Sequence, residues 1–195
     1  VERLGPEALR WFHKQRYGAN ATVIAVVGDV DAAKVVEAVR QRLGKMPTVA
    51  SPEVVVPPVA VRRGASRQVV FLPEKPNVDV LLGHQGVIAR ADPEYYPAMI
   101  ANYVFGGSGS ARLFQKVRDS MGLTYGIYSS LGTGHGAGPW SVWMTLNPAN
   151  VEKASAVVKQ MSRELVESGL TEAELAAAKE TLVGKYKVGL ATNSG

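Results

Sequence analysis

The stretch that decides the fold runs from Gly106 to Ser130 and reads GGSGSARLFQKVRDSMGLTYGIYSS. A Gly/Ser loop leads into a short helix whose last turn carries Arg118, and Tyr125 opens a strand seven residues later. Gly122 lies between them and is suited to the left-handed conformation that stops a helix, so we expect the chain to reverse sharply there. This spacing predicts that Arg118 and Tyr125 lie side by side.

The pair has both a functional and a purely structural interpretation. A guanidinium offers a planar fork of donors and a phenol adds one more, so Arg118 and Tyr125 could hold a carbonyl or carboxylate of a peptide. An arginine in the last turn of a helix also meets the negative end of the helix dipole favourably, and tyrosine is a common strand residue. Spacing alone leaves both interpretations open.

Composition excludes several classes of protein. The chain has 195 residues, of which 46% are hydrophobic and 20% charged, an ordinary globular composition with enough residues for a core. Its apolar runs are too short to insert into a membrane. The net charge of +5 is scattered along the chain, which argues against nucleic-acid binding. Zero cysteines exclude disulfides, thiolate zinc sites and a cysteine nucleophile.

The first part of the chain alternates helix and strand signals, and a Pro- and Val-rich connector at about 46–65 follows. Neither side of this connector looks able to bury a core alone, so we expect a single α+β domain over residues 1–195. The elements predicted before the connector are a helix over Pro6–Tyr17, a buried strand over Asn20–Gly28 and a helix from Asp31 to Gly44.

The rest of the chain predicts strands first and helices last. Two alternating runs joined by a Gly-rich turn predict an antiparallel hairpin, and Thr171 with Glu174 forms a capping box for the last helix. The sum is an α+β fold, with a mostly antiparallel sheet and helices packed on one face. The predicted elements are strands at Arg67–Pro73 and Val78–Leu82, a helix from Asp92, hairpin strands at Tyr125–Ser130 and Trp140–Leu146, and helices from Val151 and Thr171.

Other chemistry has little support in the sequence. The three histidines, His13, His84 and His135, are isolated, and none has a second ligand at helical spacing, so we expect no metal site and no catalytic residue in this chain. The loop at Gly106 lacks the lysine of a phosphate-binding loop. Ser110 as a helix cap explains its residues more simply.

Three stretches carry a resemblance to a known family. PEALRWFHKQRYGANATVIAVVGDVD is similar to its helix and first strand, GGSGSARLFQKVRDSMGLTYGIYSS to its central signature, and SGLTEAELAAAKETLVGKY to its late helices. In this order they resemble the C-terminal, non-zinc-binding half of the insulinase and pitrilysin-like metallopeptidases, which include the mitochondrial processing peptidases.

The resemblance implies a role in peptide hydrolysis that this chain cannot perform alone. In such enzymes another half or subunit carries the H-x-x-E-H motif, whose zinc is the cofactor of the complete enzyme. This sequence has no such motif. By resemblance, Arg118 and Tyr125 are substrate-binding residues that hold a peptide near that zinc in a closed chamber. Arg112 matches a further family arginine, for which we expect a structural role.

The same resemblance leaves other matters open. The family's domain continues past the position of Gly195, so we expect these residues to be an excerpt of a longer peptidase chain. A catalytically inactive structural or assembly subunit of the same fold is the alternative function, and a small-ligand module using Trp140 and Trp143 is a third. Localisation stays unknown, with a bacterial envelope or an organelle suggested by the resemblance alone.

Overall fold

The chain separates into two compact units. In the computed structural model, which describes residues 4–50, 57–60, 62–86 and 88–191, one unit comprises Val1–Val55 with Val188–Gly195 and the other Val56–Lys187. The boundary falls inside the connector predicted at about 46–65. The single domain over residues 1–195 stays a prediction. In the described part of the chain, no helix is both long and apolar enough to cross a membrane.

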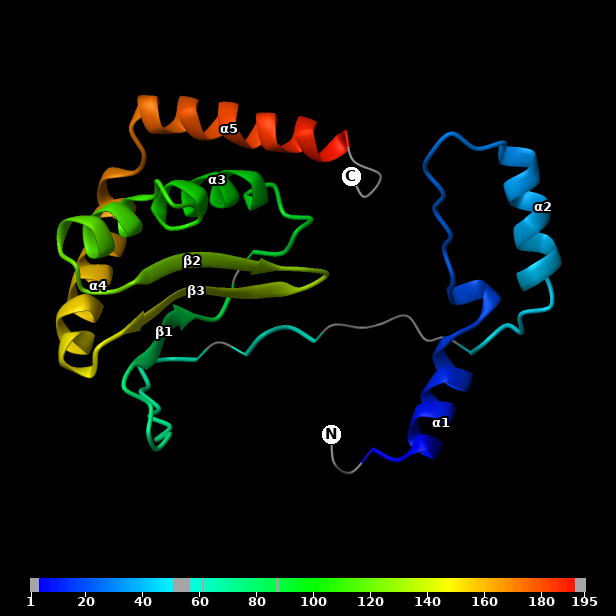
Figure 1. The fold of residues 1–195 in the computed structure, drawn as a ribbon, viewed down its shortest axis with the longest axis horizontal. Helices are drawn as coiled ribbons and strands as arrows, with labels where there is room; N and C mark the ends of the chain where they lie inside the picture. Colours follow the sequence, from blue (N-terminus) through cyan, green and yellow to red (C-terminus); the bar gives the residue numbers. More distant parts are fainter. Residues whose placement is uncertain (1–3, 51–56, 61, 87, 192–195) are drawn as a thin grey trace. The chain divides into compact units, whose positions relative to one another are not determined.

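Before the connector, the described residues of the first unit form two helices and one short turn (Figure 1). Their bounds are α1 (Pro6–Arg16), the 3₁₀ turn η1 (Ala19–Ala21) and α2 (Ala32–Leu43). Pro6 begins α1, where its missing N–H leaves no helical hydrogen bond unmade. The Asp31 carboxylate caps α2 because it accepts hydrogen bonds from the N–H groups of Ala33 (2.9 Å) and Lys34 (3.2 Å). Both helices confirm the sequence prediction.

The strand predicted over Asn20–Gly28 is wrong. After η1, residues 22–27 belong to no strand and no sheet among the described residues. The Asn20 side chain instead bonds both backbone groups of Val49, donating to its carbonyl at 2.7 Å and accepting from its N–H at 2.9 Å. The strand predicted over Arg67–Pro73 is also wrong, since no ladder forms there. A β-branched run becomes a strand only where a neighbour pairs with it.

The second unit contains a three-stranded antiparallel sheet, with β3 between β1 and β2 (Figure 1). Its strands are β1 (Val78–His84), β2 (Gly126–Thr133) and β3 (Ala137–Leu146). The register sets Met144 of β3 opposite Val80 on one side and Ile127 on the other. The predicted hairpin and the antiparallel sheet are therefore confirmed, although β2 begins one residue after Tyr125.

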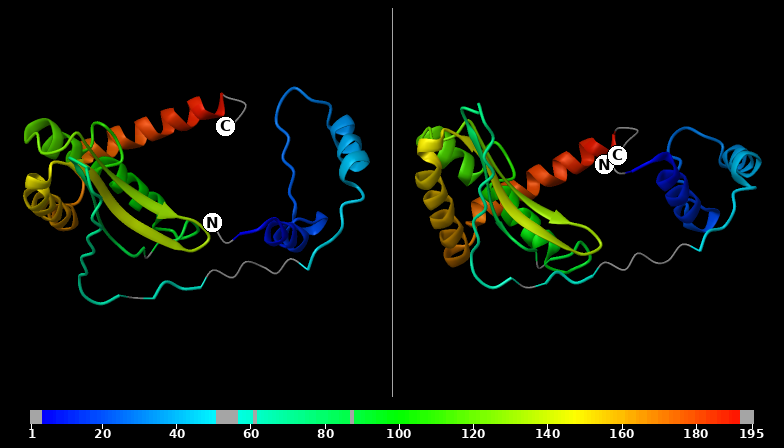
Figure 2. Two further views of the ribbon diagram at one scale, coloured as in Figure 1. Left: turned by 60° about the horizontal axis from the view of Figure 1, so that its bottom comes forward. Right: turned by 90° about the horizontal axis from the view of Figure 1, so that it is seen from below.

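The helices of this unit cover one face of the sheet (Figure 2). They are α3 (Tyr95–Phe105), the π-helical segment η2 (Phe114–Ser120), the 3₁₀ turn η3 (Pro148–Asn150), α4 (Val151–Ser168) and α5 (Glu172–Leu190), whose residues from Val188 on are grouped with the first unit. Asp92 does not begin α3 as predicted, because its carboxylate accepts the Ala89 N–H at 2.7 Å and the helix starts at Tyr95. The capping box of Thr171 and Glu174 is confirmed.

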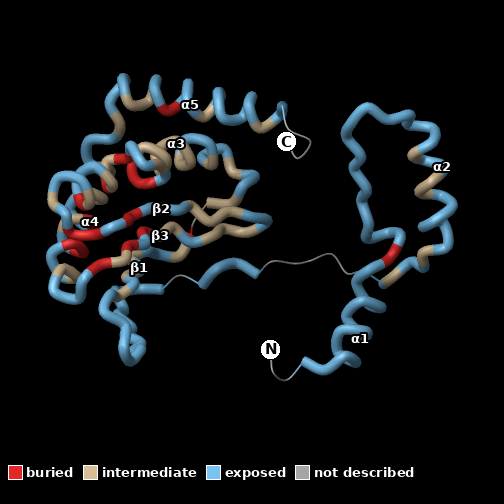
Figure 3. The backbone as a smooth tube through the Cα atoms, in the orientation of Figure 1, coloured by how far each residue is buried: buried red, intermediate tan, exposed pale blue. Residues whose placement is uncertain are grey.

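Among the described residues, a cluster of buried apolar side chains joins the sheet to α3, η2 and α4, and Figure 3 shows its backbone in red. Met144 points into it, whereas its neighbour Trp143 is partly exposed on the opposite face, as the two-residue period of a strand requires. The cluster confirms an α+β fold with helices on one face. Its members are Phe105, Leu113, Val117, Leu123, Ile127, Val142, Met144, Leu146, Ala154 and Val158.

Candidate functional site

The helix that carries Arg118 has π-helical winding over Phe114–Ser120. The Met121 N–H bonds the Lys116 carbonyl five residues back, at 3.0 Å. The segment ends at Ser120, and Gly122 then reverses the chain with a φ of 60°, in the left-handed region where a side chain is disfavoured. The predicted stop at Gly122 is confirmed, while the winding was not predicted. Such wide turns are rare in proteins and recur at functional sites.

Arg118 and Tyr125 lie in contact, as their spacing predicts. The Arg118 Nε donates a hydrogen bond to the backbone carbonyl of Tyr125 at 3.0 Å, and the guanidinium carbon lies 5.8 Å from the centre of the tyrosine ring. The contact therefore uses the backbone of Tyr125 and the face of its ring. The Tyr125 residue is 87% exposed, so its hydroxyl faces away from the core of this unit.

The guanidinium of Arg118 is oriented by two further neighbours. Its Nη1 donates to the Asp119 carboxylate at 2.8 Å, and its carbon lies 4.7 Å from the centre of the Phe114 ring. The Phe114 ring in turn lies 6.0 Å from that of Tyr128 on β2. In the described part of the chain Nη2 has no hydrogen-bond partner. Arg118 thus combines a fixed orientation with donors that no protein group uses.

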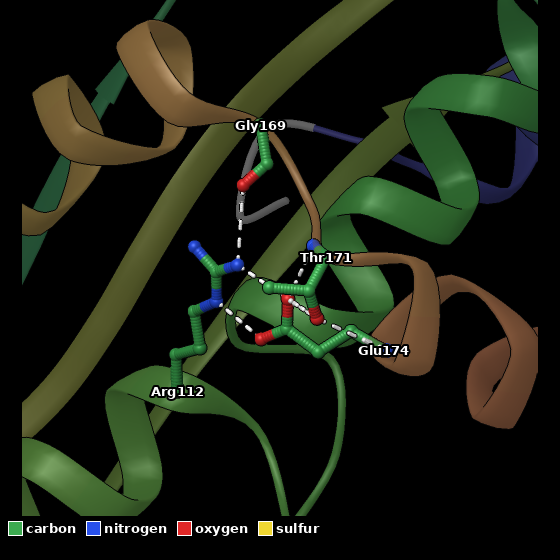
Figure 4. A network of polar contacts seen from close by, with 4 residues as sticks. All are labelled: Arg112, Gly169, Thr171 and Glu174. Carbon is green, nitrogen blue, oxygen red and sulfur yellow. Dashed lines mark hydrogen bonds and ion pairs between the residues drawn. The ribbon is translucent and has the colours of Figure 1, made fainter.

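Arg112, six residues earlier, belongs to a closed network (Figure 4). Its Nε and Nη2 donate to the two carboxylate oxygens of Glu174, at 2.7 Å and 2.5 Å, and Nη2 also donates to the Gly169 carbonyl at 3.1 Å. Glu174 accepts from the N–H of Thr171 at 2.8 Å and from its hydroxyl at 2.9 Å. One guanidinium therefore ties η2 to the end of α4 and the start of α5.

This network shifts the protonation of Glu174. The Arg112 side chain lowers the pKa of the Glu174 carboxyl from its ordinary 4.5 to about 2, and burial opposes the shift. The hydrogen bonds from Thr171 add to the lowering. The same side-chain contact with Glu174 raises the pKa of Arg112. Both groups are therefore charged at neutral pH, and their pairing supports the structural role expected for Arg112.

Two of the three histidines, His13 and His84, stack on aromatic rings. His13 stacks on Tyr17 with ring centres 4.9 Å apart, and His84 stacks on Trp140 at 5.5 Å. The three histidines thus come from α1, β1 and the turn between β2 and β3. No three His, Cys, Asp or Glu side chains gather as metal ligands in the ranges that the structure describes. These residues do not fit a zinc site.

The Gly/Ser loop before η2 has a packing role. A side chain on Gly106 would place its Cβ 2.5 Å from the Ser129 hydroxyl, and one on Gly107 would meet the Tyr103 Cα at 2.8 Å. The Ser129 N–H also bonds the Gly106 carbonyl at 2.9 Å. Glycine is required here because the end of α3 passes close to β2. The loop gives no support to a phosphate site.

Comparison with known proteins extends these observations. A family model described as the peptidase M16 inactive domain matches residues 3–182. An uncharacterized zinc protease of Streptomyces coelicolor is 31% identical over 196 residues, which cover 97% of this chain and 42% of that protein. A protein of Helicobacter pylori named a non-peptidase homolog is 33% identical over 82 residues, 42% of this chain and 19% of its own.

The fold has a counterpart among solved structures. The peptidase M16 inactive domain of Pseudomonas fluorescens aligns with a TM-score of 0.80 and 26% identity, covering 100% of this chain and 46% of that chain. The chain therefore spans less than half the length of each of these three proteins.

Proposed function

Because this chain belongs to the peptidase M16 inactive domain family, we propose that it is the substrate-holding, metal-free half of a zinc metalloendopeptidase. Arg118 and Tyr125 hold the peptide, and the zinc is supplied by an H-x-x-E-H half or subunit that closes over the same chamber. The resemblance read from the sequence is thereby confirmed at the level of the family.

The observation that carries this proposal is the oriented, incompletely paired guanidinium of Arg118 beside an exposed phenol. Nε and Nη1 are fixed by hydrogen bonds of 3.0 Å and 2.8 Å, while no group in the described part of the chain bonds Nη2 or the Tyr125 hydroxyl, which leaves both as donors. Two donors of this kind suit the carbonyl of a bound peptide. Donors fixed before the reaction also stabilise an oxyanion as it develops, at no cost in reorganisation.

The zinc would supply the activated water and the polarised carbonyl. None of that chemistry is assigned to this chain, since its described residues gather no three metal ligands. The contribution of this half is to bind and orient the peptide. Loss of this peptide binding is therefore expected to lower turnover and to leave the zinc content unchanged.

The experiment is peptide hydrolysis by the full-length natural protein, purified with whatever accompanies it, with zinc measured in parallel. We expect Arg118→Ala to lower kcat/KM about 100-fold, the usual effect of removing one oxyanion donor, with zinc retained. Tyr125→Phe removes only the hydroxyl, so a loss of about 10-fold is expected.

Arg67→Ala is the matched control, because Arg67 pairs with Glu152 at 2.9 Å where both side chains are exposed. It removes an equal charge far from η2 in the sequence and is expected to keep full activity. Full activity in Arg118→Ala would remove the functional pair.

A second candidate is a catalytically inactive structural or assembly subunit. It is favoured by one relative, the Helicobacter pylori protein whose name describes a non-peptidase homolog. A stable complex that contains the full-length protein, carries no zinc and hydrolyses no peptide would support this second function. Zinc-dependent hydrolysis that is lost with Arg118→Ala would support the first.

A further inference from the structure

The π-helical winding of η2 must be stabilised by contacts outside the segment itself. Its side chains, LFQKVRDS over residues 113–120, are ordinary helix residues that place Leu113 and Val117 in the core. These residue types are compatible with an ordinary α-helix, which is far more common than a π-helix. The local sequence therefore gives no reason for a wider turn. The reason must come from contacts at the two ends of the segment.

One end is held by the chain reversal. The N–H groups of Met121, Gly122 and Leu123 bond back to the carbonyls of Lys116, Arg118 and Val117, at 3.0 Å in each case. Gly122 then turns the chain at a φ of 60°, and Tyr125 follows beside Arg118. This end is fixed relative to β2.

The other end is held by Arg112. Its two-bond contact with Glu174 and its bond to the Gly169 carbonyl fix the residue that comes just before the segment (Figure 4). Gly169 ends α4 with a φ of 69°, and Glu174 lies in the first turn of α5. Both partners of Arg112 therefore lie at the ends of helices other than η2.

Rewinding η2 as an α-helix would break one of these two attachments. The change from a hydrogen bond five residues back to one four residues back removes one residue from a turn, which is a rotation of about 100° between its two ends. With the Tyr125 end fixed, Arg112 would leave Glu174. With Arg112 fixed, Arg118 would turn away from Tyr125.

We propose that Arg112 is a positioning residue: its contact with Glu174 and Gly169 holds the π-helical winding that turns Arg118 toward Tyr125. The expected effect of Arg112 on activity rests on the proposed function of Arg118. The expected effect of Arg112 on the π-helical winding does not depend on that function. Arg112 itself touches no substrate in this scheme: its Nε and Nη2 donate to Glu174 and to the Gly169 carbonyl.

A double-mutant cycle in the full-length protein tests the link to activity. We expect Arg112→Gln to lower kcat/KM about 10-fold, mainly through kcat, since a misplaced donor is lost chiefly from the transition state. In the Arg118→Ala background the same change is expected to cost less than about 2-fold, because nothing remains to be positioned. Arg67→Gln is the control and is expected to change neither background.

Amide hydrogen exchange tests the winding without reference to activity. In Arg112→Gln we expect the amides of Met121, Gly122 and Leu123 to exchange at least about 10-fold faster, because the Met121 hydrogen bond closes the π turn and the other two close the chain reversal that follows it. Arg67→Gln is expected to leave them unchanged. Glu174→Gln, which keeps an acceptor for the Thr171 N–H, replaces Arg112→Gln should the latter fail to fold.

Several outcomes would overturn the inference. Losses that multiply in the double mutant would mean that Arg112 acts independently of Arg118. Unchanged exchange in Arg112→Gln would mean that the winding does not depend on the network. Should Arg118→Ala keep full activity, the proposed function fails, and the exchange experiment alone decides the role of Arg112.

Discussion

Arg112 and Arg118 lie six residues apart on one helical segment and have opposite environments. Arg112 donates through Nε and Nη2 to the Glu174 carboxylate and the Gly169 carbonyl. Its charge is therefore paired within the fold. Among the described residues Arg118 bonds only the Tyr125 backbone and its neighbour Asp119, and it lies over an aromatic ring. The comparison teaches that residue type and spacing do not separate a structural arginine from a ligand-binding one. The partners do: Arg112 pairs with a carboxylate 62 residues away, where the two side chains are 27% and 30% exposed, whereas Arg118 pairs with the adjacent residue, where they are 39% and 49% exposed.

The largest effect is expected in the core beside the Arg112 end. Leu113 is fully buried, so Leu113→Ala should lower the free energy of unfolding by about 3 kcal/mol, through lost burial and the cavity left behind. Urea unfolding of the full-length protein measures it. Leu81→Ala is the control, because Leu81 is 70% exposed and should cost less than about 0.5 kcal/mol. Similar costs for the two variants would mean that this end of η2 is not anchored in the core.

A smaller effect is expected from acid at the Arg112 end. The folded pKa of Glu174 is about 2, below its ordinary 4.5, so its contribution is complete above about pH 4.5 and is lost as the pH falls toward 2. The shift from 4.5 to about 2 corresponds to at most about 3–4 kcal/mol, and we expect about 2 because the Glu174 side chain is 30% exposed to solvent. Arg112 stays charged throughout this range.

The measurement is the difference in unfolding free energy between the natural protein and Glu174→Gln, taken between about pH 6 and pH 2. Subtracting the variant removes the contribution of the other carboxyl groups. The difference should shrink as the pH falls. A difference that is constant with pH would contradict the charged pair.

The smallest effect on stability is expected at the Arg118 end. Arg118→Ala and Tyr125→Phe should each change the free energy of unfolding by no more than about 0.5 kcal/mol, because their contacts are exposed. Thermal unfolding at one protein concentration compares them with Arg67→Ala. A cost near 2 kcal/mol for Arg118→Ala would make the two arginines alike and weaken the assignment of a binding role.

Local patterns predicted much of the second unit. The hairpin, the capping box at Thr171 and the left-handed turn at Gly122 depend on residues close in sequence, so their signals are readable from the sequence alone. Arg118 and Tyr125 belong to this class, since seven residues and one reversal join them.

Other features depend on distant partners and were missed or wrongly predicted. The Arg112–Glu174 pair joins residues 62 apart in the sequence. The capping box predicted a role for Glu174, but it gave no indication that Arg112 would be its partner. The π winding has an ordinary helical pattern and carries no signal of its own. The run Asn20–Gly28 has the composition of a strand, but the hydrogen bonds of Asn20 go to Val49 instead of a ladder.

The separation of Arg112 from Glu174 also sets an order in time. A chain is made from its N-terminus at roughly 5–20 residues per second, so Glu174 is added several seconds after Arg112. The β2–β3 hairpin, whose strands are neighbours in sequence, has all its residues before α5 exists. During synthesis the segment between the two arginines is therefore held at its Tyr125 end first. Its other end closes only when the last helix begins.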